Sequence, residues 1–229
     1  MADAETRLVI FDCDGVLVDS EPISISVLVG AMNDLGVSIT EDQAYERFLG
    51  RSLSTLIDTL ETEFNVHAGE EFLERIRTDL YARFRTELKP IEGVAATIDG
   101  LGVPCCVASS SQMERIRLSL SVTGLLGKLP DIFSATMVKR GKPAPDLFLH
   151  AAREMQVEPA HCLVVEDSPA GIAAAKAAGM TVFAFTGGSH ANFAGYRAEL
   201  DRLSPEVVFD AMPDLIHLVR NHKLDGTKI

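Results

Sequence analysis

The chain has 229 residues, a formal net charge of −12 and 47% hydrophobic residues. This length accommodates one large domain, or a core domain with an insertion, and the hydrophobic fraction excludes a disordered chain. The negative charge disfavours nucleic acid and anionic membranes as partners, because both would be repelled at long range, whereas a metal-bound small anion is compatible with it.

The first predicted element is a strand over Leu8–Phe11, an apolar run that ends at Asp12-Cys13-Asp14-Gly15. Two carboxylates at the end of a buried strand are unfavourable without a cation or a shared proton. Cys13 lies between the aspartates, so we expect its side chain to point the other way, into the core. This segment is therefore the first place to expect chemistry.

A helical insertion follows, because about ninety residues separate the first strand from the next apolar run, roughly three times a normal crossover. Its predicted helices are interrupted by glycines, and one clear apolar face is formed by Leu53, Leu56, Ile57 and Leu60. We expect a core domain over residues 1–20 and 89–229 and a helical subdomain over residues 21–88.

The remaining apolar runs predict further strands, most of them continuous, as in parallel strands covered on both faces. They span Val103–Ala108, Cys162–Val165, Thr181–Phe185 and Val207–Phe209, with Ile132–Met137 as a weaker candidate. Helices are predicted over Leu147–Met155 and over Gly171–Ala178, the latter with Ser168 as its N-cap. This alternation predicts an α/β fold with a doubly wound parallel sheet.

The cysteines form no CxxC pair and lie within or beside apolar runs, at positions 13, 105, 106 and 162. Buried free thiols in a reducing cytoplasm are the simplest interpretation. The N-terminus is polar and acidic, unlike a signal peptide, and no apolar run approaches the roughly 20 residues of a membrane helix. We therefore expect a soluble cytoplasmic protein.

Polar groups follow several of the predicted strands or lie in a nearby loop: Asp12 and Asp14, Ser109–Ser111, Lys142, and Glu166-Asp167. Ligands of open parallel sheets bind beyond the carboxyl ends of the strands, so these groups should share one crevice. Acidic oxygen ligands favour Mg²⁺, and a lysine with a hydroxyl at a helix start can hold phosphate oxygens. One aspartate could act as nucleophile and the other as acid and base.

Each group also has a simpler interpretation when it is taken alone. The two aspartates could form a turn, and the serines could cap a helix that begins near Gln112. Lys142 could be an ordinary surface lysine, and Glu166-Asp167 could favour the positive end of the following helix. The combination of all four groups favours the functional interpretation.

The set resembles the haloacid dehalogenase (HAD) superfamily, specifically its helical-cap phosphatase and β-phosphoglucomutase-like branch. The matching segments are Asp12-Cys13-Asp14-Gly15-Val16-Leu17-Val18-Asp19-Ser20-Glu21, Ala108-Ser109-Ser110-Ser111, Gly141-Lys142-Pro143-Ala144-Pro145-Asp146 and Val165-Glu166-Asp167-Ser168-Pro169-Ala170-Gly171. They occur in the family's order. The resemblance implies a Rossmann-like core and makes residues 21–88 a helical cap.

The resemblance also implies a role for each matching residue. Asp12 would attack phosphorus and form an aspartyl-phosphate, and Asp14 would act as acid and base. Ser109 and Lys142 would hold the phosphoryl group. Mg²⁺ would be bound by Asp12, the backbone carbonyl of Asp14 and Asp167, with Glu166 bound directly or one step further out. Ser110, in the serine loop, and Arg51, in the cap, are further candidate substrate contacts.

Departures from the family pattern help to choose the reaction. Family dehalogenases lack an acid at the Asp14 position, and phosphonate-cleaving relatives use a cap lysine, whereas the first lysine here is Lys89. Family mutases carry a histidine where this chain has Ser24, and a phosphate-gripping arginine where it has Leu53. These departures favour a phosphatase.

We therefore expect a Mg²⁺-dependent phosphatase that acts on a small phosphorylated metabolite, of the sugar phosphate or phosphoglycolate type. The alternatives are a β-phosphoglucomutase-like mutase, which shares every core residue, and a non-catalytic binding protein on the same fold. For assembly we expect a monomer or a weak homodimer, with no nucleic-acid or membrane partner.

Overall fold

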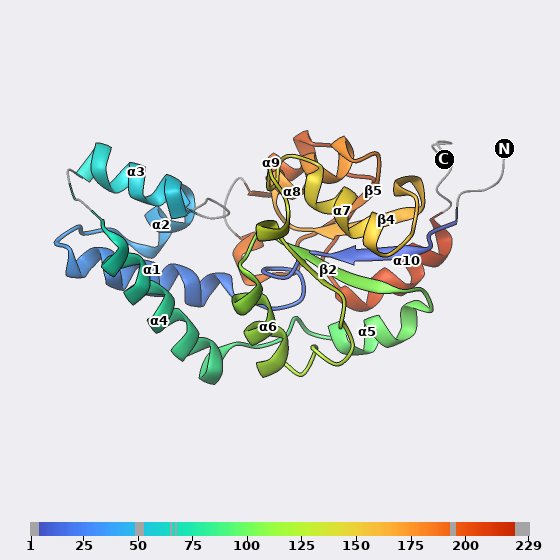
Figure 1. Cartoon of the computed structure of the whole chain (residues 1–229), viewed down its shortest axis with the longest axis horizontal. Helices are drawn as coiled ribbons and strands as arrows, with labels where there is room; N and C mark the ends of the chain where they lie inside the picture. Colours follow the sequence, from blue (N-terminus) through green and yellow to red (C-terminus); the bar gives the residue numbers. More distant parts are fainter. Residues whose placement is uncertain (1–4, 49–52, 65, 67, 193–195, 223–229) are drawn as a thin grey trace. The chain divides into compact units, whose positions relative to one another are not determined.

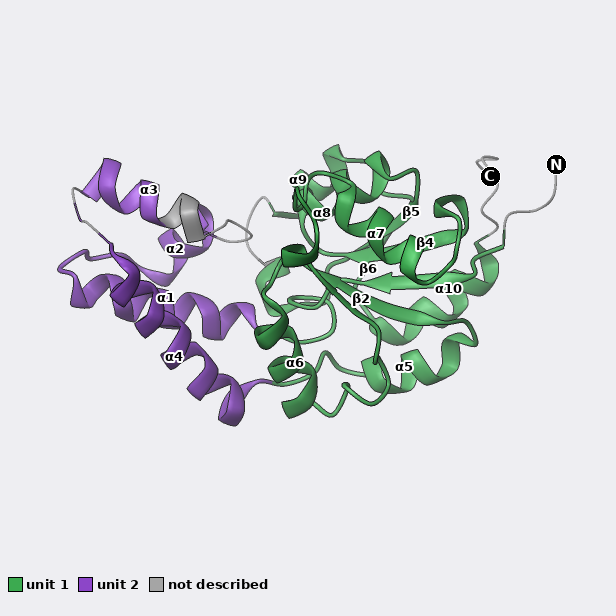
Figure 2. Cartoon of the chain, viewed as in Figure 1, with its two compact units in different colours: residues 1–19, 89–229 green, residues 20–88 purple. Residues whose placement is uncertain are grey.

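The computed structural model describes residues 5–48, 53–64, 66, 68–192 and 196–222. The chain divides into two compact units, coloured separately in Figure 2. The core unit comprises residues 1–19 and 89–229, and the helical unit comprises residues 20–88. The chain leaves the core unit after its first strand and returns to it at Lys89, so the helical unit is an insertion.

The described residues of the core unit form a six-stranded sheet in the order β3-β2-β1-β4-β5-β6, and all paired strands are parallel. The bounds are β1 Leu8–Phe11, β2 Cys105–Ser109, β3 Ile132–Ser134, β4 Cys162–Glu166, β5 Thr181–Phe185 and β6 Val207–Phe209. The order reverses between β1 and β4, which is where ligands bind in such sheets. The predicted α/β fold class is confirmed.

Helices of the core unit cover both faces of the sheet. Figure 1 shows α7 and α8 on one side and α5 and α10 on the other. The bounds are α5 Val94–Leu101, α6 Met113–Val122, α7 Asp146–Glu154, α8 Pro169–Ala177, α9 Tyr196–Arg202 and α10 Leu215–Asn221. Every residue of β1 and β4 is buried, which explains why these strands read as continuous apolar runs.

The end of β3 differs from the sequence-based prediction. The run Ile132–Met137 was expected to be one strand, but β3 stops at Ser134 and a 3₁₀ turn covers Ala135–Met137. The Ser134 hydroxyl accepts a hydrogen bond from the Thr136 amide at 3.2 Å. This bond offers the backbone a turn instead of continued strand pairing, which an apolar pattern alone does not reveal.

Helix α8, Pro169–Ala177, has the N-cap that the sequence predicts, although it begins two residues before the predicted Gly171. The Ser168 hydroxyl accepts from the Gly171 amide at 3.0 Å and forms the N-cap. Pro169 occupies the first turn, where its missing N–H costs nothing. Gly179 follows the helix with a φ of 72°, a conformation that glycine adopts without strain.

The described residues of the helical unit form α1 Glu21–Asp34, α2 Glu41–Phe48, α3 Leu53–Phe64 and α4 Glu70–Glu87. Helix α4 buries one face, formed by Phe72, Ile76, Leu80, Tyr81 and Phe84, a spacing that repeats every helical turn. It packs against α1, and Arg83 on α4 donates to the Ser26 hydroxyl at 2.9 Å. Within the described residues, no helix has the length and apolar character needed to cross a membrane.

The cysteines of the core unit should resist alkylation in the folded protein. Burial raises the pKa of Cys105 to about 12 and that of Cys162 to about 11, and it also raises the pKa of Cys13. At pH 8 only about one Cys105 in ten thousand is then the reactive thiolate, against roughly a quarter of ordinary thiols. We expect iodoacetamide to label the native chain at least about a hundredfold more slowly than the chain in guanidinium, measured by mass spectrometry. Equal rates in both states would contradict the burial.

Candidate active site

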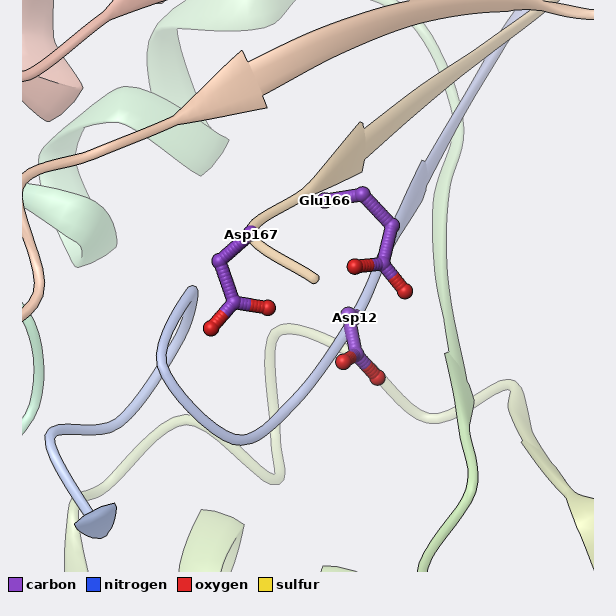
Figure 3. A group of neighbouring side chains, drawn as sticks. All are labelled: Asp12, Glu166 and Asp167. Atoms are coloured by element: carbon purple, nitrogen blue, oxygen red, sulfur yellow. The ribbon is translucent and has the colours of Figure 1, made fainter. Parts of the chain in front are cut away.

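The site forms where β1 and β4 end side by side. Phe11 pairs with Val165 in the sheet register, and the Asp12 amide donates to the Val165 carbonyl at 3.0 Å. Asp12 and Asp167 therefore follow neighbouring strands at the same edge. Figure 3 shows the carboxylates of Asp12, Glu166 and Asp167 directed toward one another. Each can offer an oxygen within 4.8 Å of the others.

Lys142 provides positive charge inside this cluster. Its side chain is only 3% exposed, and Nζ lies 2.6 Å from Glu166 Oε1 and 3.0 Å from Asp12 Oδ1. It also donates to the Ala108 carbonyl at the end of β2, at 3.0 Å. Burial alone would lower the Lys142 pKa, but the carboxylates of Asp12 and Glu166 outweigh it and raise the pKa. Lys142 is therefore a fixed cation and not the surface lysine of the simpler interpretation.

Glu166 has both oxygens engaged by protein donors. Oε1 accepts from Lys142, and Oε2 accepts from the amide and hydroxyl of Ser168 at 2.8 and 2.9 Å. A Cβ on Gly171 would lie 1.7 Å from Oε1, so this glycine leaves the space that the carboxylate occupies. These bonds tie Glu166 to the start of α8 and direct its charge to Lys142.

The cluster carries more negative than positive charge. Burial raises the pKa of Asp12, and nearby Glu166, Asp167 and Asp14 add to the effect, although Lys142 opposes it. Burial also raises the pKa of Asp167. A divalent cation would neutralise the excess, and an all-oxygen donor set fits a hard ion such as Mg²⁺. Asp12 and Asp167 are the residues best suited to hold this ion, because the oxygens of Glu166 already accept hydrogen bonds from Lys142 and Ser168.

Asp14 lies in a separate hydrogen-bonded group. Oδ1 is 2.9 Å from an Arg115 guanidinium nitrogen, and Oδ2 accepts from the Ser111 hydroxyl at 2.7 Å. Arg115 lies on the first turn of α6, and Ser111 precedes that helix. The Asp14 side chain is 14% exposed, more accessible than Glu166. Asp14 can therefore exchange a proton with a bound molecule while its carboxylate stays oriented.

The serine loop contributes unequally. Ser109 is buried at the end of β2, and its hydroxyl accepts from the Ser111 amide at 3.1 Å, whereas Ser110 is exposed. The N-cap of α6 is Gln112, so the simpler interpretation of these serines as helix caps is wrong. Arg51 lies outside the described residues.

Sequence reasoning missed side chains that complete the cluster. These are Arg115, which lies 2.9 Å from Asp14, and His190, which lies 2.9 Å from Asp167, whereas Ser111, which also holds Asp14, was expected in the crevice with the other loop serines. A positional signal was available for His190, because Gly187-Gly188-Ser189-His190 follows β5 at the same edge of the sheet. Arg115 lies within a helix and gave no comparable signal.

Comparison with known families decides the relationship. The model of the haloacid dehalogenase-like hydrolase family matches residues 9–185, a span that includes Asp12, Lys142 and Asp167. The chain belongs to the haloacid dehalogenase-like hydrolase family. The resemblance identified from the sequence is confirmed.

Individual relatives of this HAD chain agree. It is 35% identical over 184 residues to 6-phosphogluconate phosphatase of Escherichia coli (strain K12), across 80% of this chain and 83% of the relative. A haloacid dehalogenase-like protein of Agrobacterium tumefaciens str. C58 shares 36% identity with a TM-score of 0.84, across 94% of this chain and 98% of that chain. A HAD family hydrolase of Deinococcus radiodurans R1, solved with bound phosphate and sodium, shares 31% identity with a TM-score of 0.79, across 99% and 100%. Relatives named as phosphatases support the predicted phosphoric monoester hydrolase class.

The contact between Gly171 and Glu166 can be tested by paired substitutions. We expect Gly171→Ala to lower the free energy of unfolding by about 1–3 kcal/mol, because the added methyl overlaps the Glu166 carboxylate. Gly30→Ala is the matched control, since Gly30 also lies within a helix but has no atom within 4 Å of an added Cβ. The control should be neutral or stabilised by up to about 1 kcal/mol. Urea denaturation followed by circular dichroism measures both, and equal effects would contradict the assignment.

Proposed function

We propose that this HAD enzyme is a Mg²⁺-dependent phosphatase that hydrolyses a phosphorylated sugar or sugar acid through an aspartyl-phosphate on Asp12. The observation that carries the proposal is the group of Asp12, Lys142 and Asp167 at one edge of the sheet, with Asp14 held beside it by its own donors. The group combines a nucleophile, fixed positive charge, a cation site and a proton-transfer residue. Phosphoryl transfer requires mainly such alignment and charge neutralisation.

In the first step, a carboxylate oxygen of Asp12 attacks phosphorus, and the bond between phosphorus and the sugar oxygen breaks. Lys142, 3.0 Å from Asp12, orients the nucleophile and can donate to a phosphoryl oxygen. The Ser109 hydroxyl, which accepts from the Ser111 amide, can donate its hydrogen to another phosphoryl oxygen. The leaving sugar oxygen takes a proton from Asp14.

In the second step, water attacks the phosphorus of the aspartyl-phosphate and releases inorganic phosphate. Asp14, left as a carboxylate by the first step, accepts a proton from that water and regains its acid form. The Ser111 hydroxyl can serve both forms, because it donates to the carboxylate and can rotate to accept from the acid. Arg115 favours the carboxylate form of Asp14 and holds its side chain in one orientation.

Asp12 and Asp167, with the backbone carbonyl of Asp14, are the proposed magnesium ligands. The bound ion would neutralise phosphoryl oxygens and so lower the repulsion between an anionic substrate and the Asp12 carboxylate. Glu166 acts on Lys142 in this proposal, because its oxygens are engaged by Lys142 and Ser168. Fixing Lys142 in this way keeps positive charge beside the nucleophile.

The substrate class is drawn from the relatives, one of which is named 6-phosphogluconate phosphatase and others hexitol phosphatase B. We propose a linear or cyclic sugar phosphate, and we retain residues 21–88 as the helical cap that selects it. A cytoplasmic location, with the Mg²⁺ and reduced thiols of that compartment, belongs to the same proposal. Arg51 remains a proposed substrate contact within residues 21–88.

The nucleophile can be tested with 6-phosphogluconate and p-nitrophenyl phosphate as substrates. We expect Asp12→Asn to lower kcat/KM for both by about a thousandfold or more, because an amide cannot form the aspartyl-phosphate. EDTA should abolish wild-type activity, and excess MgCl₂ should restore it. Phosphate release is the measurement. An active Asp12→Asn protein would refute the mechanism, whereas isomerised sugar phosphate outpacing phosphate release would indicate a mutase.

The proton-transfer role of Asp14 predicts a dependence on the leaving group. Asp14→Asn should lower kcat/KM by roughly 10²–10⁴-fold for a sugar phosphate but far less for p-nitrophenyl phosphate, whose leaving group needs no proton. Because kcat/KM reports steps up to expulsion of the leaving group, the later water step does not mask the difference. Arg115→Ala should follow the same pattern with a smaller loss, because Asp14 would lose the contact that orients its side chain.

Arg117→Ala is the matched control, because Arg117 is an exposed arginine on the same helix, α6. It should leave both substrates unaffected. Equal losses for good and poor leaving groups in the Asp14→Asn and Arg115→Ala proteins would remove the general-acid assignment.

A further inference from the structure

His190 is a buried residue in the 3₁₀ turn Ser189–Asn192 that follows β5, and only 1% of it is exposed. Its Nε2 lies 2.9 Å from Oδ2 of Asp167. Strands β4 and β5 are neighbours in the sheet, so the turn after β5 borders the residues that follow β4. The matched family segments do not include this histidine, and the proposed reaction does not use it.

The position of the His190 ring is fixed by its surroundings. A Cβ on Gly188 would lie 2.7 Å from its Cε1, and a Cβ on Gly15 would lie 2.8 Å from the same atom. The ring of Tyr196 meets it edge-on, with centroids 5.1 Å apart. Two glycines and an aromatic ring therefore leave a narrow slot that directs Nε2 toward Asp167.

Asp167 is held at its backbone as well. The Tyr196 hydroxyl donates to the Asp167 carbonyl, while His190 engages one oxygen of the Asp167 carboxylate. A carboxylate that binds a cation through one oxygen can accept a hydrogen bond from the protein at its second oxygen. His190 and Tyr196 thus restrain both ends of a residue whose carboxylate is directed toward Asp12 (Figure 3).

We propose that His190, supported by Tyr196, is a positioning residue for the divalent cation, a role that rests on the proposed function. By donating from Nε2 to one carboxylate oxygen, it orients Asp167 before the ion arrives. Partners of this kind around metal ligands typically change affinity by roughly tenfold to a hundredfold. Asp167 then loses its conformational freedom when the protein folds, so the free energy of cation binding does not include that entropic cost.

The test is isothermal titration of the EDTA-stripped, full-length chain with MgCl₂, which measures binding without turnover. His190→Leu removes the donor and should weaken Mg²⁺ binding by roughly tenfold to a hundredfold. His190→Gln retains an N–H donor and should recover part of that loss. In phosphate-release assays, His190→Leu should raise the Mg²⁺ concentration for half-maximal activity, with little change in the sugar phosphate KM at saturating Mg²⁺.

His150→Leu is the matched control, because His150 on α7 also packs edge-on against an aromatic ring, that of Phe133, and its Nδ1 contacts Arg153 and Glu154. Its Mg²⁺ dissociation constant should stay within about twofold of wild type. Tyr196→Phe provides a second, milder variant that should weaken binding by about threefold to tenfold. If His190→Leu does not fold, the Mg²⁺ affinity of the Tyr196→Phe protein tests the positioning role in its place.

The outcomes separate this inference from the function on which it rests. Wild-type protein that binds no Mg²⁺ would overturn both. Wild-type protein that binds Mg²⁺, with unchanged binding in the His190→Leu and Tyr196→Phe proteins, would overturn the positioning role and leave the phosphatase assignment intact. Weakened binding in His190→Leu and partial recovery in His190→Gln would support it.

Discussion

Concentrated negative charge in a buried place is the constraint on which the rest of the site depends. Asp12, Glu166 and Asp167 are buried with oxygens within 4.8 Å of one another. Like charges at such separations interact strongly away from bulk water, and the raised pKa of Asp12, due first to its burial, reflects that environment. Lys142 neutralises part of this charge, and the remaining negative charge favours the binding of a cation. The surrounding side chains either reduce the negative charge or orient the carboxylates that carry it.

Close backbone approach is what allows these charges to gather. A Cβ on Gly171 would fall on the Glu166 carboxylate, and a Cβ on Gly15 would fall 2.0 Å from Asp167 Oδ2. Gly15 also has a φ of 77°, which lets the chain turn back directly after the aspartates. The site is thus a consequence of two tight turns at the ends of adjacent strands as well as of its polar residues.

Most of the fold could be predicted from sequence, because parallel strands buried on both faces appear as apolar runs, and β1 and β5 have the predicted bounds. Residues that directly follow strands were also predictable by position, as Asp12 after β1 and Asp167 after β4 illustrate. Arg115 was not, because a helix surface provides many arginines and only three-dimensional packing selects one. The pairing of Glu166 with Lys142 could not be predicted from the sequence either, since it depends on which donors surround each carboxylate oxygen.

The pattern of partners shows how the acidic residues differ although their side chains are alike. Glu166 is bound by Lys142 and the start of α8, Asp167 by His190, and Asp14 by Arg115 and Ser111. These donors come from separate segments of the chain, so folding itself fixes each carboxylate. Groups oriented during folding need no reorganisation when charge develops on a substrate. The sheet edge sets where the acids meet, and their individual donors set what each of them can do.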